Sequence, residues 1–149
     1  MTANKKVYLA SDHAGADLRK AVASYVKAQG LQVIDLGPDD GSSVDYPDYG
    51  EKLAMALSED ADARGVAVCG SGIGISIAVN RFPWARAALV SSVEAAKLSR
   101  EHNDANVIAL GERLISEDTA LACIDVFLAT DFEGGRHARR VDKLTKLSS

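Results

Sequence analysis

The chain has 149 residues, of which 47% are hydrophobic and 26% charged, and its formal net charge is −4. This length supplies one globular domain with a sizeable core, and we treat residues 1–149 as that single domain. The acidic balance excludes a general nucleic-acid-binding surface, although a local basic cluster can still hold a phosphate. No apolar run approaches the length of a membrane span, which excludes a membrane protein.

The N-terminus and the cysteines indicate a cytoplasmic protein. Residues 1–6 lack the long apolar core and the cleavage site of a signal peptide. Cys69 and Cys123 stand in apolar contexts without CxxC spacing. This pattern is typical of reduced thiols rather than of a disulfide framework or a zinc site, so no metal is implied.

The first part of the chain predicts a strand, a helix and a second strand. Residues 6–10 form a short apolar run of the kind found in buried strands. An apolar stripe between Leu18 and Val26 predicts a helix, which Gly30 ends, and residues 31–36 read as the second strand. Residues 37–47 are rich in Gly, Pro, Asp and Ser and form the longest loop, and such loops are often functional.

The rest of the chain continues this alternation. The predicted elements are a helix with a stripe at Tyr49, Leu53, Ala56 and Leu57, a strand at 65–68, an apolar helix at 73–79, a strand at 86–90, a helix capped by Ser92 and running to about Arg100, a strand at 106–110, a helix at 117–129 and a last helix after Gly135. The alternation predicts an α/β fold: a doubly wound, mostly parallel five-stranded sheet with helices on both faces, in a Rossmann-like three-layer sandwich.

The segment Cys69-Gly70-Ser71-Gly72-Ile73-Gly74 joins the third strand to an apolar helix. Glycines let backbone N–H groups approach a ligand, and a helix N-terminus favours negative charge, whether on a ligand or on a thiol. A dinucleotide fingerprint requires glycine at position 75, which is Ile75, and the Walker lysine is also absent. The loop therefore suits a small anion or a developing oxyanion, whereas Cys69 alone is also compatible with a small buried hydrophobe.

Polar residues follow several strands at their carboxyl ends, where open parallel sheets bind ligands. These residues are Asp12 and His13 after the first strand, Asp45 and Tyr46 after the second, Cys69 after the third and Arg113 after the fifth. We expect several of them, and His102 with them, to share one edge of the sheet.

Each candidate also has a structural interpretation. Asp12 can cap the first helix, with His13 as a surface residue of the same turn, and Tyr46 before a proline can be surface packing. His102-Asn103 fits a helix C-terminus, where histidine complements the dipole and asparagine tolerates a left-handed turn. Arg136 and Arg140 share a helix face and can either bind a phosphate or form a solvated basic surface.

Five segments together resemble the ribose-5-phosphate isomerase B family, whose wider group includes the galactose-6-phosphate isomerase subunits. They are residues 11–15 (SDHAG), 45–47 (DYP), 69–76 (CGSGIGIS), 102–104 (HND) and 134–137 (GGRH) with Arg140. The segments run in order from the first strand to the last helix, without a large insertion. The resemblance implies the reversible isomerisation of ribose 5-phosphate and ribulose 5-phosphate in the pentose phosphate pathway, with no metal or organic cofactor.

The resemblance also implies roles for the site residues. Cys69 takes the place of the base that moves a proton between C2 and C1 through an enediolate, and His102 with Asp12 would open the furanose ring. Ser71 and the amides of Gly70, Gly72 and Gly74 would hold the enediolate oxygens, Asn103 would bind the sugar, and the phosphate pocket would contain His13, Arg113, Arg136 and Arg140. Members of the family are homodimers or dimers of dimers whose active sites use both chains.

Other functions remain open at this stage. Relatives with very similar loops act on six-carbon sugar phosphates such as allose 6-phosphate or galactose 6-phosphate. A non-catalytic module that binds phosphorylated metabolites would show the same glycine loop and the same pair of arginines. The missing third glycine already disfavours a nucleotide-dependent oxidoreductase.

Overall fold

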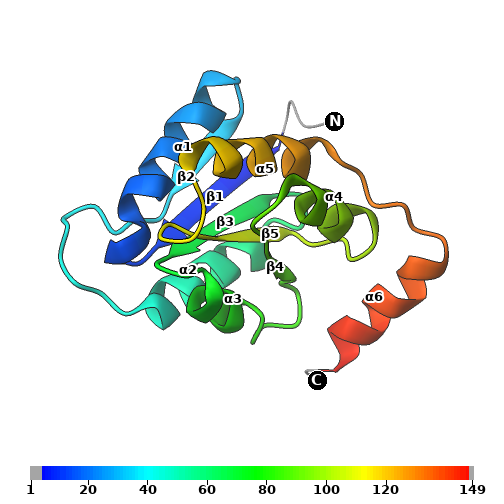
Figure 1. The fold of residues 1–149 in the computed structure, drawn as a ribbon. Helices are drawn as coiled ribbons and strands as arrows, with labels where there is room; N and C mark the ends of the chain where they lie inside the picture. The colour runs from blue at the N-terminus through cyan, green and yellow to red at the C-terminus, as the bar shows by residue number, and fades with distance from the viewer. Residues whose placement is uncertain (1–4, 148–149) are drawn as a thin grey trace.

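Five short strands form the centre of the computed structural model, which describes residues 5–147 (Figure 1). They are β1 (Lys6–Ser11), β2 (Gln32–Asp35), β3 (Arg64–Cys69), β4 (Ala87–Leu89) and β5 (Val107–Gly111). All pairs are parallel, and the order across the sheet is β2-β1-β3-β5-β4. Each parallel connection needs a crossover, and helices supply it.

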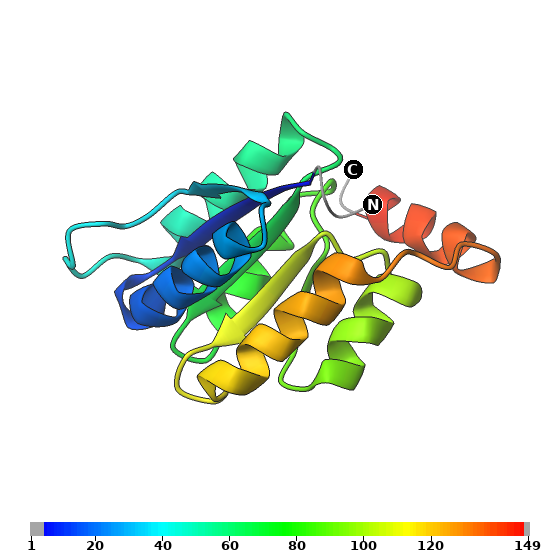
Figure 2. The same cartoon turned by 90° about the horizontal axis from the view of Figure 1, so that it is seen from above.

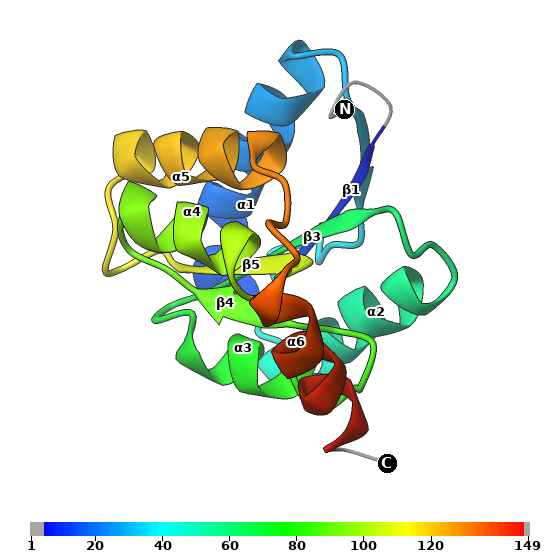
Figure 3. The same ribbon diagram turned by 90° about the vertical axis from the view of Figure 1, so that its right-hand side faces the viewer.

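The helices cover both faces of the sheet, which confirms the predicted doubly wound α/β fold. They are the short 3₁₀ turn η1 (His13–Gly15), α1 (Ala16–Ala28), α2 (Tyr46–Ser58), α3 (Ile73–Val79), α4 (Val93–Glu101), α5 (Glu117–Ala129) and α6 (Arg136–Lys146). Viewed along the sheet, α1, α4 and α5 form one layer and α2 and α3 form the other (Figure 3). Seen from above, α5 lies between α1 and α4 (Figure 2).

Residue size differs between the two faces of the sheet. The strand residues that face α1, α4 and α5 are large: Val7, Leu9, Val66, Val68, Ile108 and Leu110. The residues that face α2 and α3 include the small Ala10, Ala67 and Ala109, and Cys69 continues this series at the carboxyl end of β3. Because side chains alternate along a strand, Cys69 is directed toward the α2 and α3 layer.

Most predicted boundaries agree with the structure to within one or two residues. The helix at 117–129 is as expected, and Ser92 caps α4 by accepting a hydrogen bond from the amide of Ala95 at 3.2 Å. One detail at the end of α4 is wrong: the left-handed residue is Asp104, with φ of 46°, rather than Asn103. Aspartate tolerates this conformation for the same reason as asparagine, because its short polar side chain bonds locally.

Helix α6 stands apart from the two helical layers, at the right of Figure 1. Only His137 and Val141 of this helix are buried within the chain. Among residues 5–147 there is no helix with the length and apolar character needed to cross a bilayer. The expectation that no signal peptide is present rests partly on residues 1–4, which lie outside the described part of the chain.

Gly111, at the end of β5, allows the backbone of Ser71, in the loop at 70–72, to lie directly against it. A Cβ atom at this position would lie 2.4 Å from the carbonyl oxygen of Ser71. We therefore expect Gly111→Ala to lower the free energy of unfolding by about 1–3 kcal/mol, the usual cost of forcing extra volume into packed structure. Urea unfolding followed by circular dichroism measures this change.

Gly65→Ala is the matched control, because the added methyl group would meet only the side chains of Val107 and Leu53, at 3.1 Å and beyond. Those side chains can shift, so the loss of stability should be clearly smaller. Equal losses in the two variants would show that the backbone contact at Gly111 carries no special constraint.

Candidate functional site

A cavity of about 520 Å³ opens at the carboxyl ends of β1, β3 and β5. Eight of the predicted site residues line it: Asp12, His13, Tyr46, Cys69, Gly70, Ser71, Gly74 and Arg113. Ala14, Ile73 and Ile77 complete the lining. The volume lies in the range of small-molecule sites, and the cavity holds acidic, basic and nucleophilic side chains together.

The Cys69 thiol lies at the bottom of this cavity, where the residue is 4% exposed. The amide of Gly72 donates a hydrogen bond to Cys69 Sγ at 3.1 Å, and this donor stabilises negative charge on the sulfur. Gly72 has φ of 78°, a left-handed conformation that glycine adopts without strain. Gly72 does not line the cavity as Gly70 and Gly74 do, and its amide is used by the sulfur in this structure.

Arg113 is brought over the loop by a continuation of the pairing between β3 and β5. The amides of Glu112 and Arg113 donate to the carbonyl oxygens of Cys69 and Gly70, at 3.0 and 2.9 Å. The Arg113 guanidinium nitrogen Nη1 lies 3.1 Å from the place that a Cβ atom on Gly70 would take. Gly70 therefore leaves room for the Arg113 guanidinium over the loop, where it lines the same cavity as Cys69.

Asp12 and His13 stand directly after β1 and line the cavity. Asp12 Oδ1 accepts a hydrogen bond from the amide of Gly15 at 3.0 Å, so Asp12 caps the 3₁₀ turn η1, whereas the N-cap of α1 itself is Gly15. Asp12 is buried and also lines the cavity, which means that capping and a chemical role are compatible. His13 is exposed, and its Nδ1 lies 3.1 Å from the amide nitrogen of Val44 and 3.2 Å from the Val44 carbonyl oxygen.

Tyr46 and Ser71 complete the wall near α3. Tyr46 begins α2, and its ring packs on Gly74 so closely that a Cβ atom there would lie 2.6 Å from ring atoms. Ser71 Oγ accepts a hydrogen bond from the amide of Ile73 at 3.2 Å. This bond uses one of the first amides of α3 but leaves the hydroxyl proton of Ser71 available to a ligand.

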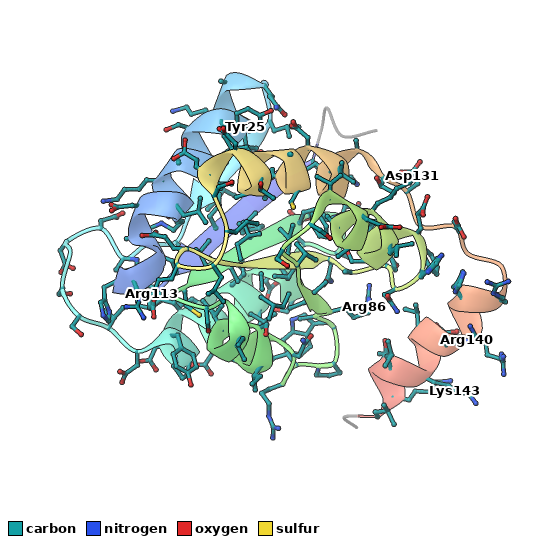
Figure 4. The ribbon with its side chains drawn as sticks, viewed as in Figure 1. Tyr25, Arg86, Arg113, Asp131, Arg140 and Lys143 are labelled. Carbon is teal, nitrogen blue, oxygen red and sulfur yellow. The ribbon has the colours of Figure 1, made fainter. Side chains whose placement is uncertain are left out.

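The other four predicted residues lie at the opposite edge of the sheet. His102 caps the C-terminus of α4 and Asn103 follows it, both before β5, whereas Arg136 and Arg140 belong to α6. Figure 4 shows the separation, with Arg113 at one side of the chain and Arg140 at the other. The expectation that His102 shares an edge with Cys69 is therefore wrong for a single chain, because residues that precede a strand lie at its amino end.

This second group has its own cavity and its own cluster of ionisable side chains. Asn103 lines a cavity of about 480 Å³ together with residues before and along β4 and with Leu144 and Leu147 of the α6 region. Next to it, the imidazole rings of His102 and His137 are stacked at 4.4 Å. Glu133 Oε1 lies 4.0 Å from His102 Nε2 and 3.7 Å from His137 Nε2.

The three side chains of His102, Glu133 and His137 are of types that bind transition metals, and their ligand atoms lie within 4.8 Å of one another. The two rings, however, are inclined by only 18°. Each imidazole lone pair lies in the plane of its ring, so nearly parallel stacked rings do not direct both nitrogens at one point. The arrangement observed does not fit a metal centre.

Burial lowers the pKa of His137, and the positive charges of His102, Arg136 and Arg140 act in the same direction. Glu133 opposes them, but by less than burial contributes. The His137 side chain is 10% exposed, which is consistent with a ring that is neutral in the folded protein.

Sequence reasoning found most of the cavity but missed the residues that support it. Arg19 and Val44 were not identified, although Arg19 is fully buried and Val44 contacts His13. Val44 acts through its backbone, which leaves no signal in residue type. Arg19 stands next to the apolar stripe of α1, where a charged residue ordinarily faces solvent.

The chain is similar to sugar-phosphate isomerases over nearly its whole length. Residues 7–144 match the family described as Ribose/Galactose Isomerase. A probable ribose-5-phosphate isomerase B of Mycoplasma pneumoniae is 41% identical over 97% of this chain and 95% of its own length. The ribose-5-phosphate isomerase B of Escherichia coli is 38% identical over 96% of each chain.

Solved structures give the same result. Ribose-5-phosphate isomerase B of Clostridium thermocellum superposes with a TM-score of 0.93 at 46% identity, covering 95% of this chain and 96% of the other. The enzyme of Mycoplasma genitalium with bound ribulose-5-phosphate superposes with a TM-score of 0.92 at 37% identity, covering 95% of each.

The lowered pKa of His137 predicts a pH dependence of stability. The His137 ring binds a proton more readily in the unfolded chain than in the folded chain. The part of the free energy of unfolding that depends on this ring is therefore complete at pH values above its ordinary pKa of 6.5, and it is lost as the pH falls below that value. We expect the urea midpoint of the wild type to exceed that of His137→Gln by a larger margin at about pH 7 than at about pH 5. A difference between the two proteins that stays constant across this range would contradict the assignment.

Proposed function

This chain belongs to the ribose/galactose isomerase family, and from that membership we propose that it interconverts ribose 5-phosphate and ribulose 5-phosphate with Cys69 as the general base. The observation that carries the proposal is the Cys69 thiol at the bottom of the cavity, with the Gly72 amide donating to its sulfur. The structure with bound ribulose-5-phosphate among the similar proteins supports the choice of a five-carbon sugar. Allose 6-phosphate and galactose 6-phosphate are the six-carbon alternatives to be tested beside it.

The isomerisation moves a proton between neighbouring carbons. The Cys69 thiolate removes the C2 proton of the open-chain aldose, and negative charge develops on the C1 oxygen. The hydroxyl proton then passes from the C2 oxygen to the C1 oxygen, and the thiol returns its proton to C1, which leaves the carbonyl group at C2 and the thiolate restored. Such carbon acids are weak, so the reaction needs a positioned base and donors aimed at the oxygen that gains charge. In our proposal the Ser71 hydroxyl and the amides of Gly70 and Gly74, all at the cavity wall, supply these donors.

The phosphate binds at the cationic parts of the site. Arg113 lies against Gly70 and lines the cavity, and so does His13. Guanidinium groups suit phosphate because their planar fork donates hydrogen bonds in pairs. Binding energy from this non-reacting group can orient the sugar and lower the barrier of the chemical step. No metal or organic cofactor has a role in this scheme.

We further propose that each complete site is formed by two chains of a homodimer or of a dimer of dimers. The residues assigned to ring opening, sugar binding and phosphate binding, namely His102, Asn103, Arg136 and Arg140, lie at the edge opposite Cys69 within one chain. In a two-fold dimer the same surface of each chain meets its copy, so the α6 end of one chain can complete the Cys69 cavity of the other. The two free cysteines fit a cytoplasmic location.

The role of Cys69 predicts a separation of binding from chemistry. In Cys69→Ala the turnover number should fall by about 10²- to 10⁴-fold, the usual contribution of a general base, while ribose 5-phosphate still binds. A coupled assay of ribulose 5-phosphate formation and calorimetric binding measure the two quantities.

Cys123→Ala is the matched control, because Cys123 is the other cysteine of the chain and is buried against the α1 and α5 side of the sheet. It should keep near-wild-type turnover. Unchanged turnover in Cys69→Ala would refute Cys69 as the base.

The shared site predicts complementation between inactive variants. Cys69→Ala and His102→Asn should each be inactive as homodimers, but a mixed dimer contains one site with both native residues. Random reassociation after mild denaturation should restore about a quarter of the wild-type activity, since half of the dimers are mixed and each has one of two sites intact. Activity that stays at the level of the separate variants would place Cys69 and His102 of one chain in the same site.

A further inference from the structure

Arg19 of α1 is a fully buried arginine to which the proposed chemistry assigns no role. Its Nη1 donates a hydrogen bond to Ser11 Oγ at 2.7 Å, and its Nη2 donates to the carbonyl oxygen of Pro38 at 2.7 Å. Its Nε lies 3.0 Å from Asp35 Oδ1 and its Nη2 lies 3.7 Å from Asp39 Oδ1, in two ion pairs. A buried guanidinium is costly unless it is paired, so these four partners are conditions for its burial.

The partners of Arg19 belong to the two segments that lead into the cavity. Ser11 ends β1 and immediately precedes Asp12 and His13. Pro38 is the second residue of the loop at 37–45, which ends where Tyr46 begins α2. The fork of the guanidinium thus joins the last residue of β1 to the first part of this loop, a link that a single donor atom cannot make.

The loop is fastened to the same segment at both of its ends. At its start, the Ser11 amide donates to the carbonyl oxygen of Gly37 at 3.2 Å, beside the Arg19 contacts. At its far end, the amide of Val44 donates to His13 Nδ1 at 3.1 Å. The carbonyl oxygen of Val44 lies 3.2 Å from the same nitrogen, so the backbone of Val44 engages Nδ1 whether that nitrogen accepts or donates, and Nε2 is left for a ligand.

We propose that Arg19 is a positioning residue of the isomerase: it fixes the 37–45 loop on the end of β1, so that the backbone of Val44 holds the His13 ring by Nδ1 and leaves Nε2 to the substrate phosphate. This rests on the proposed function, in which His13 binds the phosphate. Arg19 does not line the cavity that contains Cys69. It therefore acts on the site through Ser11 and Pro38.

The test compares two substitutions of Arg19. Arg19→Met removes the fork and the charge, whereas Arg19→Lys keeps the charge but cannot bridge two acceptors in the same geometry. In Arg19→Met the KM for ribose 5-phosphate should rise about tenfold, as expected for loosening a hydrogen bond to a charged group, with a much smaller change in kcat. Arg19→Lys should recover part of this loss.

A second readout does not depend on activity. The ¹⁵N chemical shifts of the His13 ring at mildly alkaline pH report which nitrogen carries the proton, and His13→Gln identifies its signals. In the wild type the two ring nitrogens should show shifts displaced from those of free histidine at the same pH, and in Arg19→Met these shifts should move toward the free-histidine values. If the protein turned out not to isomerise ribose 5-phosphate, this measurement would still decide whether Arg19 orders His13.

Tyr25→Phe is the control on the same helix. It removes the hydrogen bond from Tyr25 Oη to Asp125 between α1 and α5, far from Arg113 in Figure 4, and should leave KM and the His13 shifts unchanged. Should Arg19→Met fail to fold, Arg19→Lys carries the test through the same two readouts. A folded Arg19 variant with wild-type KM and wild-type His13 shifts would overturn the proposal.

Discussion

The hydrogen bond from the Gly72 amide to the Cys69 sulfur is the contact on which the rest of the site depends. It forms because β3 ends at Cys69 and the chain turns through a left-handed Gly72 into α3. Gly111 lets this turn lie directly against β5, and the small residues on this face of the sheet let α2 and α3 pack closely over it. A buried thiol held in this way has a fixed position at the cavity.

The division of the predicted site between two edges follows from the same topology. Residues after a strand, such as Asp12, Cys69 and Arg113, gather at the carboxyl edge, and residues before a strand, such as His102, gather at the amino edge. A second copy of the chain is the simplest way to bring the two sets together. Helix α6 stands apart from the other helices and buries little of its surface within the chain. This is the position expected of a helix that contacts a neighbouring subunit.

The sequence was sufficient for the fold and for one half of the site. Apolar runs separated by helical stripes gave the parallel sheet, because burial on both faces leaves a continuous apolar signal in each strand. The carboxyl-edge rule then brought Asp12, Tyr46 and Cys69 together. His102 was nevertheless grouped with them, although the same rule places a residue that follows a helix and precedes a strand at the amino edge. Arg19 and Val44 escaped because their roles depend on tertiary contacts rather than on residue type.

The measurement that tests the central claim most directly is an NMR time course of ribose 5-phosphate with the protein in D₂O. Proton transfer through an enediolate with a thiol base predicts formation of ribulose 5-phosphate, together with replacement of the transferred hydrogen by solvent deuterium at C1 of the ketose and C2 of the aldose. Six-carbon phosphates should react far more slowly under the same conditions. Absence of interconversion, or equal turnover of allose 6-phosphate, would contradict the account.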